Sequence, residues 1–173
     1  RRWLCAGLLL FLAGCATKPP APPVSESVLA EPQRQYMCVS KIFISDASRA
    51  YSLSGQLDGD AFAVPVGQWM NDRIRKVFWQ DSTVKAGGRP QPTLAVGFAQ
   101  GTGVRTALRG DNAEVQVVLQ FQILWPTGQA YNDIVAGRAT AQDAGQAAGA
   151  ALVDAVQELE RILLNAGVCR QVQ

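Results

Sequence analysis

The segment from residue 113 to residue 125 places the strongest constraint on how this chain can fold. Within it, apolar residues recur at every second position, and the intervening residues are mostly Glu or Gln. Strict alternation over this length predicts an antiparallel strand with one buried face and one hydrated face. Val118 and Leu124 interrupt the polar side, which leaves two alternatives open. Either a partner or a second subunit covers the outer face, or that face is simply left in water.

Shorter patterns predict the other elements around this strand. Apolar runs predict strands near residues 39–44, 94–98 and 129–139, the last of which follows a turn at Pro126-Thr127-Gly128. Apolar residues spaced by three and four predict helices near residues 65–79 and 141–166. Residues 46–63 have no clear period and indicate a long loop, and residues 101–110 indicate a glycine-rich connection.

The second predicted helix carries signals for its start, its end and its packing. Thr140 is the expected N-cap, with Asp143 in capping-box spacing, and Gly167 is the expected C-terminal cap. The first half of its apolar side is almost entirely Ala and Gly, which predicts a close approach between this helix and a neighbouring sheet. Polar residues along the helix, including Gln142 and Asp154, exclude a membrane-spanning segment.

The element order β-α-β-β-β-α predicts an α+β fold. We expect a two-layer sandwich, in which two helices pack on one face of a four-stranded mixed sheet. A crossover through the first helix makes the first two strands parallel. The last helix then runs back towards the start of the first strand, which places Cys38 and Cys169 at the same end of the domain. We therefore expect a Cys38–Cys169 disulfide, with two unpaired thiols as the alternative.

The N-terminal residues have the form of an export signal. Arg1 and Arg2 precede a short apolar run that ends at Leu12-Ala13-Gly14-Cys15. A positive start, a short apolar segment and small residues before the cleavage point are typical of a secretory signal peptide, and the run is too short to span a bilayer. The tetrapeptide resembles the lipobox of bacterial lipoproteins, which implies cleavage before Cys15 and acylation (palmitate) of that cysteine. The alternative is an ordinary signal peptide with a chance cysteine.

This interpretation divides the chain into three parts. Residues 1–14 are the signal peptide, residues 15–35 are the lipidated cysteine and a Pro-rich tether, and residues 36–173 form a single domain. The alternative for the middle part is a merely disordered leader. Cleavage removes Arg1 and Arg2, so the 16 basic residues become 14, against 14 acidic residues. This balance argues against nucleic acid as a partner, because phosphate binding requires a concentrated basic face.

Few side chains in the sequence are suited to catalysis. There is no histidine, which removes the commonest general base and metal ligand. Cysteine metal sites need clustered thiolates, so we expect no metal and no cofactor. Asp46, Asp58 and Asp60 are the closest candidates for an acid–base pair, but their spacing is equally that of a polar turn. Trp79 and Trp125 are candidates for partner contact, and the alternative is that they cap the margin of the core.

Together these features resemble the small α+β lipoproteins of Gram-negative envelopes. The chain is similar to the YajG-like family and, more distantly, to the lipopolysaccharide-assembly lipoprotein that plugs an outer-membrane barrel. Two of the features that carry the resemblance are N-terminal, the lipobox and the Pro-rich segment. The others lie in the domain: Pro92-Thr93-Leu94-Ala95-Val96, the strand at 115–125 with its Gly128 turn, and Val135-Ala136-Gly137. The last of these precedes the Ala-rich helix, which ends in Leu159, Ile162 and Leu163. The resemblance implies no enzymatic activity and assigns no site residue. In such lipoproteins Ala16, directly after the lipidated cysteine, favours sorting to the outer membrane.

We therefore expect a non-catalytic periplasmic domain anchored to the outer membrane through Cys15. It would serve as an accessory or scaffold in an envelope assembly, with an envelope protein or a second copy of itself as partner. The alternative is a carrier or binding module for a lipid or another small apolar ligand, held between helix and sheet. A third hypothesis, an enzyme, depends on Asp46, Asp58 or Asp60.

Overall fold

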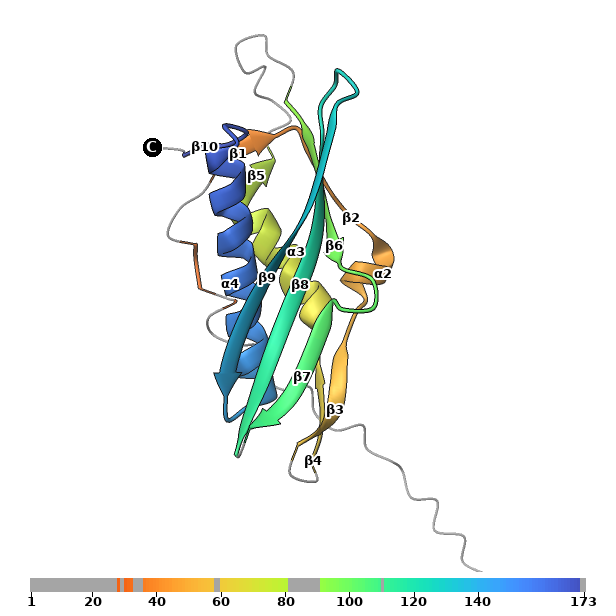
Figure 1. Cartoon of the computed structure of the whole chain (residues 1–173), viewed down its shortest axis with the longest axis vertical. Coiled ribbons are helices and arrows are strands. Elements are labelled where there is room, and N and C mark those ends of the chain that lie inside the picture. Colours follow the sequence, from red (N-terminus) through yellow and green to blue (C-terminus); the bar gives the residue numbers. More distant parts are fainter. Residues whose placement is uncertain are drawn as a thin grey trace, which may run out of the picture.

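The computed structural model describes residues 28, 30–32, 36–57, 60–80, 91–109 and 111–171, and these form an α+β fold (Figure 1). The largest sheet is mixed. Four of its strands lie side by side in the order β2 (Lys41–Ile44), β6 (Thr93–Phe98), β8 (Asn112–Leu124) and β9 (Ala130–Ala141). β2 and β6 are parallel, as the predicted crossover requires, whereas β6, β8 and β9 are antiparallel neighbours.

A further strand, β7 (Val104–Arg109), gives this sheet five strands within the described residues. β8 is 13 residues long, and β6 pairs with only its C-terminal half. β7 pairs with the N-terminal half along the same edge, so β6 and β7 are two parts of one interrupted strand. The expected glycine-rich connection over 101–110 is therefore wrong for most of its length. The physical reason is that the backbone groups on that edge of β8 need hydrogen-bond partners.

The expected first strand, residues 39–44, divides into two strands near Ser40. β2 stays in the large sheet, while β1 (Tyr36–Val39) joins β5 (Phe78–Gln80) and β10 (Arg170–Gln171) in a small second sheet with the order β10-β1-β5. The Ser40 N–H donates to the carbonyl of Pro92 at 2.9 Å, which fixes the chain where it passes between the sheets. The expected four-stranded sheet therefore misses both the second sheet and β7.

The expected long loop at 46–63 also contains regular structure. It begins with a four-residue helix, α2 (Asp46–Arg49), and continues into a hairpin of β3 (Leu53–Leu57) and β4 (Asp60–Val64). Among the hairpin side chains that the structure describes, only Leu53 and Val64 are buried. A hairpin that buries so little shows no alternation of apolar and polar residues, which explains why the sequence indicated a loop.

Two longer helices, α3 (Val66–Val77) and α4 (Ala144–Asn165), supply the other layer. They contact each other, and α4 also lies along β8 and β9. Trp69 and Ile74 of α3, Leu152 of α4, and the inward side chains of β8 belong to one hydrophobic core. The core therefore lies between the large sheet and the two helices, as the two-layer prediction requires.

The predicted close approach of the Ala-rich helix to the sheet is confirmed at Gly137 of β9. A Cβ atom at this position would overlap the carbonyl oxygen of Ala151 and the backbone nitrogen of Ala155, both in α4. Side chains of alanine on this stretch of the helix, such as Ala147 and Ala148, are fully buried. The backbones of helix and strand therefore touch, and no layer of larger side chains separates them.

The cap of α4 differs from the predicted one. Asp143, not Thr140, is the N-cap, and its Oδ1 accepts a hydrogen bond from the Gln146 N–H at 2.8 Å. Thr140 lies in β9, opposite Glu114. The expectation that Thr140 caps the helix is wrong because the last strand runs further than the sequence indicated. Gly167 follows the helix in the left-handed region (φ 67°), as predicted for a C-terminal cap.

These two residues give a stability prediction with an internal control. Asp143→Ala removes the acceptor for an exposed helix N–H and is expected to lower the free energy of unfolding by about 1 kcal/mol. Thr140→Ala is expected to change it by less than about 0.5 kcal/mol, because Thr140 is an exposed residue of the strand. Urea unfolding followed by circular dichroism measures both. Equal losses for the two variants would contradict the assignment of the cap.

Three residues from the predicted tether, Val28, Ala30 and Glu31, lie against the folded domain. Val28 is buried in the core, and the Arg73 Nη1 donates to the Ala30 carbonyl at 2.8 Å. An ion pair joins Lys76 Nζ to Glu31 Oε1 at 3.3 Å. The guanidinium of Arg73 is itself buried, so this hydrogen bond satisfies one of its donors away from water.

Candidate functional site

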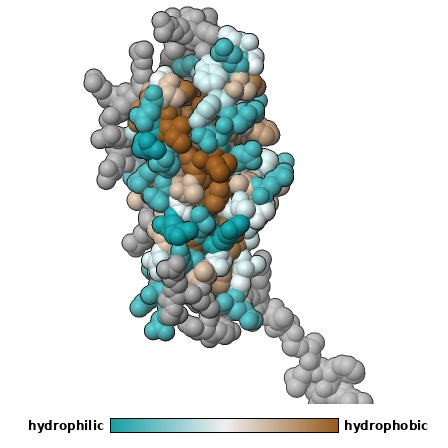
Figure 2. Space-filling view, in the orientation of Figure 1, coloured by the Kyte–Doolittle hydropathy of each residue, from teal (hydrophilic) through white to brown (hydrophobic). Residues whose placement is uncertain are grey.

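The outer face of the large sheet carries exposed apolar residues. We call "outer face" the middle of the side of the sheet that points away from α3 and α4, where the strand register places the side chains of Phe43, Ala95, Val118, Gln120, Gln122, Leu124, Asn132, Ile134 and Ala136. Ile134 is 60% exposed, Phe43 56% and Leu124 45%. In the view of Figures 1 and 2, β8 and β9 pass in front of α3, and a band of hydrophobic surface runs from the C-terminal end of α4 across the middle of β8.

Charged residues on this side of the sheet lie towards its two ends, as far as the structure describes them, and they include Arg105, which is exposed and lies opposite Gln116. Lys41 stands at one end, in the same cross-strand row as Leu124. At the other end, Glu114 Oε1 and Arg138 Nε form an ion pair at 3.3 Å. Between them, the polar members of the outer face are amides, which both donate and accept hydrogen bonds. A partner that docks between the two ends would desolvate mainly apolar groups and amides.

The free edge of β9 is partly blocked by carboxylates. The Ile134 N–H donates to Asp133 Oδ1 at 2.8 Å, and the Arg138 N–H donates to Asp154 Oδ2 of α4 at 3.1 Å. The Tyr131 hydroxyl donates to the other oxygen of Asp133 at 2.7 Å, and these bonds hold the pKa of Asp133 below its usual range. Occupied edge groups resist the addition of another strand. The flat outer face, rather than this edge, is therefore the surface open to a partner.

A second feature is a hollow of about 380 Å³ between α2 and the loop that interrupts the β6–β7 edge. We call it "the hollow"; it is lined by Ala47, Ser48, Tyr51, Phe98, Ala99, Gln100, Gly101, Gly103 and Val104. The rings of Tyr51 and Phe98 contact each other with centroids 4.9 Å apart. The loop bulges out between two hydrogen bonds to Val118, from the Ala99 N–H to its carbonyl and from its N–H to the Gly103 carbonyl. Bulges of this kind are frequent beside functional sites.

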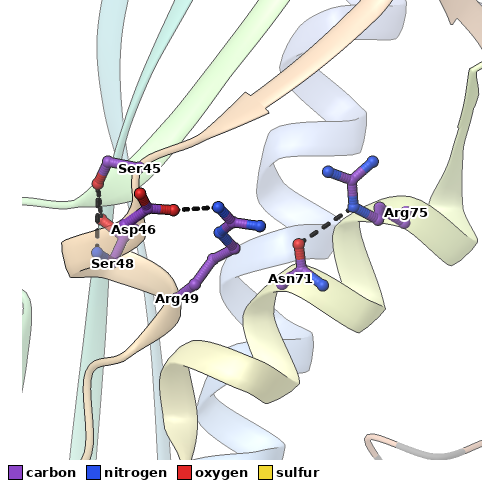
Figure 3. A network of polar contacts seen from close by, with 6 residues as sticks. All are labelled: Ser45, Asp46, Ser48, Arg49, Asn71 and Arg75. Carbon is purple, nitrogen blue, oxygen red and sulfur yellow. Dashed lines mark hydrogen bonds and ion pairs between the residues drawn. The ribbon is translucent and has the colours of Figure 1, made fainter.

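Two glycines allow α2 to pack closely beside the hollow. A Cβ at Gly67 would overlap the Ser48 carbonyl oxygen, and a Cβ at Gly97 would lie 2.9 Å from Ser48 Oγ. The Gly67 N–H donates to the Tyr51 carbonyl at 2.9 Å, so the segment is tied directly to the first turn of α3. Figure 3 shows the local polar contacts, in which Ser45 caps α2 and Asp46 pairs with Arg49.

The residues singled out from the sequence fall in different places. Trp125 is half-buried and packs against the core, which favours its role as a cap of the core margin. The side chain of Trp79 lies outside the described part of the structure, although its backbone pairs with Met37 in the small sheet. Cys15, the signal peptide at 1–14 and most of the tether also lie outside the described residues.

The two domain cysteines lie on paired strands. β1 and β10 are antiparallel, with Tyr36 opposite Gln171 and Met37 opposite Arg170. Continuing this register by one residue sets the backbone of Cys38 opposite Cys169. Cys169 is buried. The side chain of Cys38 is outside what the structure describes.

The three candidate acidic residues do not form a described pair. Asp46 forms its ion pair with Arg49 on α2, and its side chain is largely exposed. Asp58 and the side chain of Asp60 lie outside the described residues. Within the parts of the chain that the structure places, no group of His, Cys, Asp and Glu is arranged to hold a metal ion, and no helix is long and apolar enough to cross a membrane.

Sequence reasoning singled out part of the outer face through Val118 and Leu124, but it missed Phe43, Ile134 and the hollow. The hollow forms where a loop and a short helix bring distant residues together, and no spacing in the sequence predicts this contact. Gly67 and Gly97 were the available hint, since each interrupts an otherwise apolar pattern.

Comparison with known proteins adds one structural likeness. The fold is similar to the crystal structure of protein XCC0632 from Xanthomonas campestris, described under the family DUF330, with 14% sequence identity and a TM-score of 0.41. The alignment covers 78% of this chain and 85% of that chain. At this level of similarity we base no conclusion on it. No protein-family model matches the sequence, and no curated protein does.

Proposed function

We propose that this protein is a non-catalytic, lipid-anchored periplasmic lipoprotein that serves as an accessory or scaffold in an outer-membrane assembly. The observation that carries the docking part of this proposal is the exposure of Phe43, Leu124 and Ile134 on one face of the sheet. The proposed outer-membrane localisation and lipid anchor are supported by the lipobox at Leu12-Ala13-Gly14-Cys15 and by Ala16 after it. The likeness to YajG-like lipoproteins belongs to the same proposal.

The outer face fits a protein partner better than it fits bulk water. Covering one large apolar side chain contributes on the order of 2 kcal/mol. Three such side chains surrounded by amides match the mixed composition of a docking surface whose rim is polar. Single exposed apolar residues need no explanation, but a group that shares one face indicates an interaction site.

The alternative, a carrier of a lipid between helix and sheet, finds less support in the packing. At Gly137 the backbone of α4 lies directly on β9, and the alanines around this contact are fully buried. A ligand in this part of the interface would have to displace the helix. The amide-rich outer face offers no enclosed space for an acyl chain either.

We further propose the Cys38–Cys169 disulfide. Directly opposite residues in antiparallel strands have Cα atoms about 4.5–5.5 Å apart, which lies within the range that a disulfide bridges. The register of β1 and β10 supports this pairing, as does the buried position of Cys169.

Site-specific photo-crosslinking tests the docking proposal in cells. A photoreactive residue at Ile134 of the full chain is expected to crosslink to one discrete envelope protein or to a second copy of the chain, identified by mass spectrometry. The matched control places the same residue at Gln157, an exposed position of α4. Equal crosslinking at both positions, or none at Ile134, would contradict docking through the outer face.

A pair of substitutions then measures what the apolar groups contribute. The double variant Phe43→Gln/Ile134→Gln is expected to weaken co-purification of that partner at least tenfold, because the two lost apolar contacts together cost more than about 1.4 kcal/mol. The free energy of unfolding is expected to change by less than about 1 kcal/mol, since both side chains are exposed. Unchanged co-purification with an intact fold would count against the proposal.

A further inference from the structure

Burial in the hydrophobic core does not explain the position of α2. None of its four residues is buried, so the helix adds nothing to the core. Even so, its backbone lies against Gly67 at distances that leave no room for a side chain there, and the Ser48 hydroxyl lies close to Gly97. The close contact with Gly67 fixes the backbone of this segment and, with it, the position of the side chains that it presents. Those side chains are Ser48 and, just after the helix, Tyr51, and both line the hollow.

The lining of the hollow combines an aromatic surface with groups that both donate and accept hydrogen bonds. Tyr51 and Phe98 supply the rings, with the interplanar angle of 43° leaving them tilted rather than stacked. The Ser48 hydroxyl accepts from Ser45 at 3.0 Å, which leaves its own hydrogen to donate, and Gln100 presents an amide. At Gly101 the space around the backbone is open, so a ligand can approach the loop closely.

Charge is missing from this lining. None of the nine residues around the hollow is ionisable apart from the Tyr51 phenol. The nearest charges on α2, Asp46 and Arg49, pair with each other and neutralise one another. A phosphate or carboxylate ligand would therefore find no cation to compensate its charge, and charged ligands depend on such partners.

We propose that the hollow binds a neutral saccharide unit. A sugar ring has an apolar C–H face, which fits the rings of Tyr51 and Phe98, and hydroxyls that both donate and accept, which fit Ser48, Gln100 and the loop backbone. A proline-rich peptide would use the aromatic rings but offers only carbonyl acceptors, so it matches the polar half of the lining less well. The volume of about 380 Å³ is near the lower end for ligand pockets, and the hollow is open, so the expected affinity is millimolar.

Saturation-transfer NMR on the full chain tests this proposal with maltotriose and triacetylchitotriose as neutral probes. At least one of the two is expected to bind, with a dissociation constant obtained by titration. Tyr51→Ala is expected to weaken binding about tenfold, because it removes one ring of the platform, whereas Tyr51→Phe keeps the ring and is expected to retain most of the affinity. Phe43→Ala is the matched control, since it removes an exposed ring from the outer face and leaves the hollow intact.

Three outcomes would overturn the proposal. The first is the absence of saturation transfer to either sugar, and the second is binding that Tyr51→Ala leaves unchanged. The third is preferential binding of another class of ligand: glucose 6-phosphate bound more tightly than the neutral sugars, or a peptide of residues 16–27, with its four prolines, bound in their place. None of the nine residues that line the hollow belongs to the outer face, so the effect of Tyr51→Ala on sugar binding is measured independently of the crosslinking at Ile134.

Discussion

Gly137→Ala is expected to lower the free energy of unfolding by about 3 kcal/mol, the upper end of the usual cost of overpacking. The added methyl group would overlap backbone atoms of Ala151 and Ala155 in α4. A flexible side chain could rotate away from such a contact, but the backbone of a helix cannot. Either α4 or β9 must therefore move, and the buried alanines along their contact lose close packing. Urea unfolding followed by circular dichroism measures the loss.

The neighbouring residue supplies the control. Ala136→Val adds two carbon atoms to β9 on the exposed outer face, one position away from Gly137. We expect a change of less than about 0.5 kcal/mol, because the added atoms meet solvent and Val suits a strand. If Gly137→Ala were as mild as Ala136→Val, the direct contact between α4 and β9 would be refuted.

Loss of the proposed Cys38–Cys169 disulfide is expected to have the largest effect on stability. In the chain-entropy model, releasing a loop of about 130 residues lowers the free energy of unfolding by about 5 kcal/mol. The double variant Cys38→Ala/Cys169→Ala is expected to show this loss in an oxidising buffer. Part of the loss will come from the smaller side chain at Cys169, which is buried.

Reduction of the unmodified protein distinguishes the contribution of the disulfide to stability from the contribution of the cysteine side chains. Dithiothreitol is expected to destabilise the unmodified protein by nearly the same amount and to leave the double variant unaffected. Peptide mapping without reduction should show one crosslinked peptide that contains both cysteines. Alkylation of both as free thiols in protein from an oxidising compartment would refute the bond.

The parts of the fold that follow from local periodicity could be predicted from the sequence. β8 buries alternate residues such as Val115, Val117 and Leu119, and α3 buries the residues at helical spacing. The Ala and Gly positions of α4 predicted a close approach, and the structure has it at Gly137. Each of these elements buries one side, and burial of one side makes apolar residues recur at a regular spacing in the sequence.

What escaped prediction depends on contacts between distant residues. The interruption between β6 and β7 exists because both strands pair with β8, and Asp143 caps α4 because β9 runs on to Ala141. The hairpin of β3 and β4 buries too little to leave a pattern. The outer face was predicted only in part, because Phe43 and Ile134 lie on strands whose register cannot be read from the sequence.

The contacts of Val28, Ala30 and Glu31 bear on how far the domain can stand from a membrane. Val28 is in the core and the Ala30 carbonyl is hydrogen-bonded to Arg73, so the leash from the proposed anchor at Cys15, residues 16–28, reaches the domain at residue 28 and not at the start of β1. At about 3.1 Å per residue, those 13 residues reach roughly 40 Å when fully extended. If Cys15 is the anchor, residue 28 lies within a layer of that depth above the bilayer, and a partner for the outer face lies within that depth plus the length of the domain. Insertion of ten residues into the leash should extend this layer by about 30 Å without changing the fold.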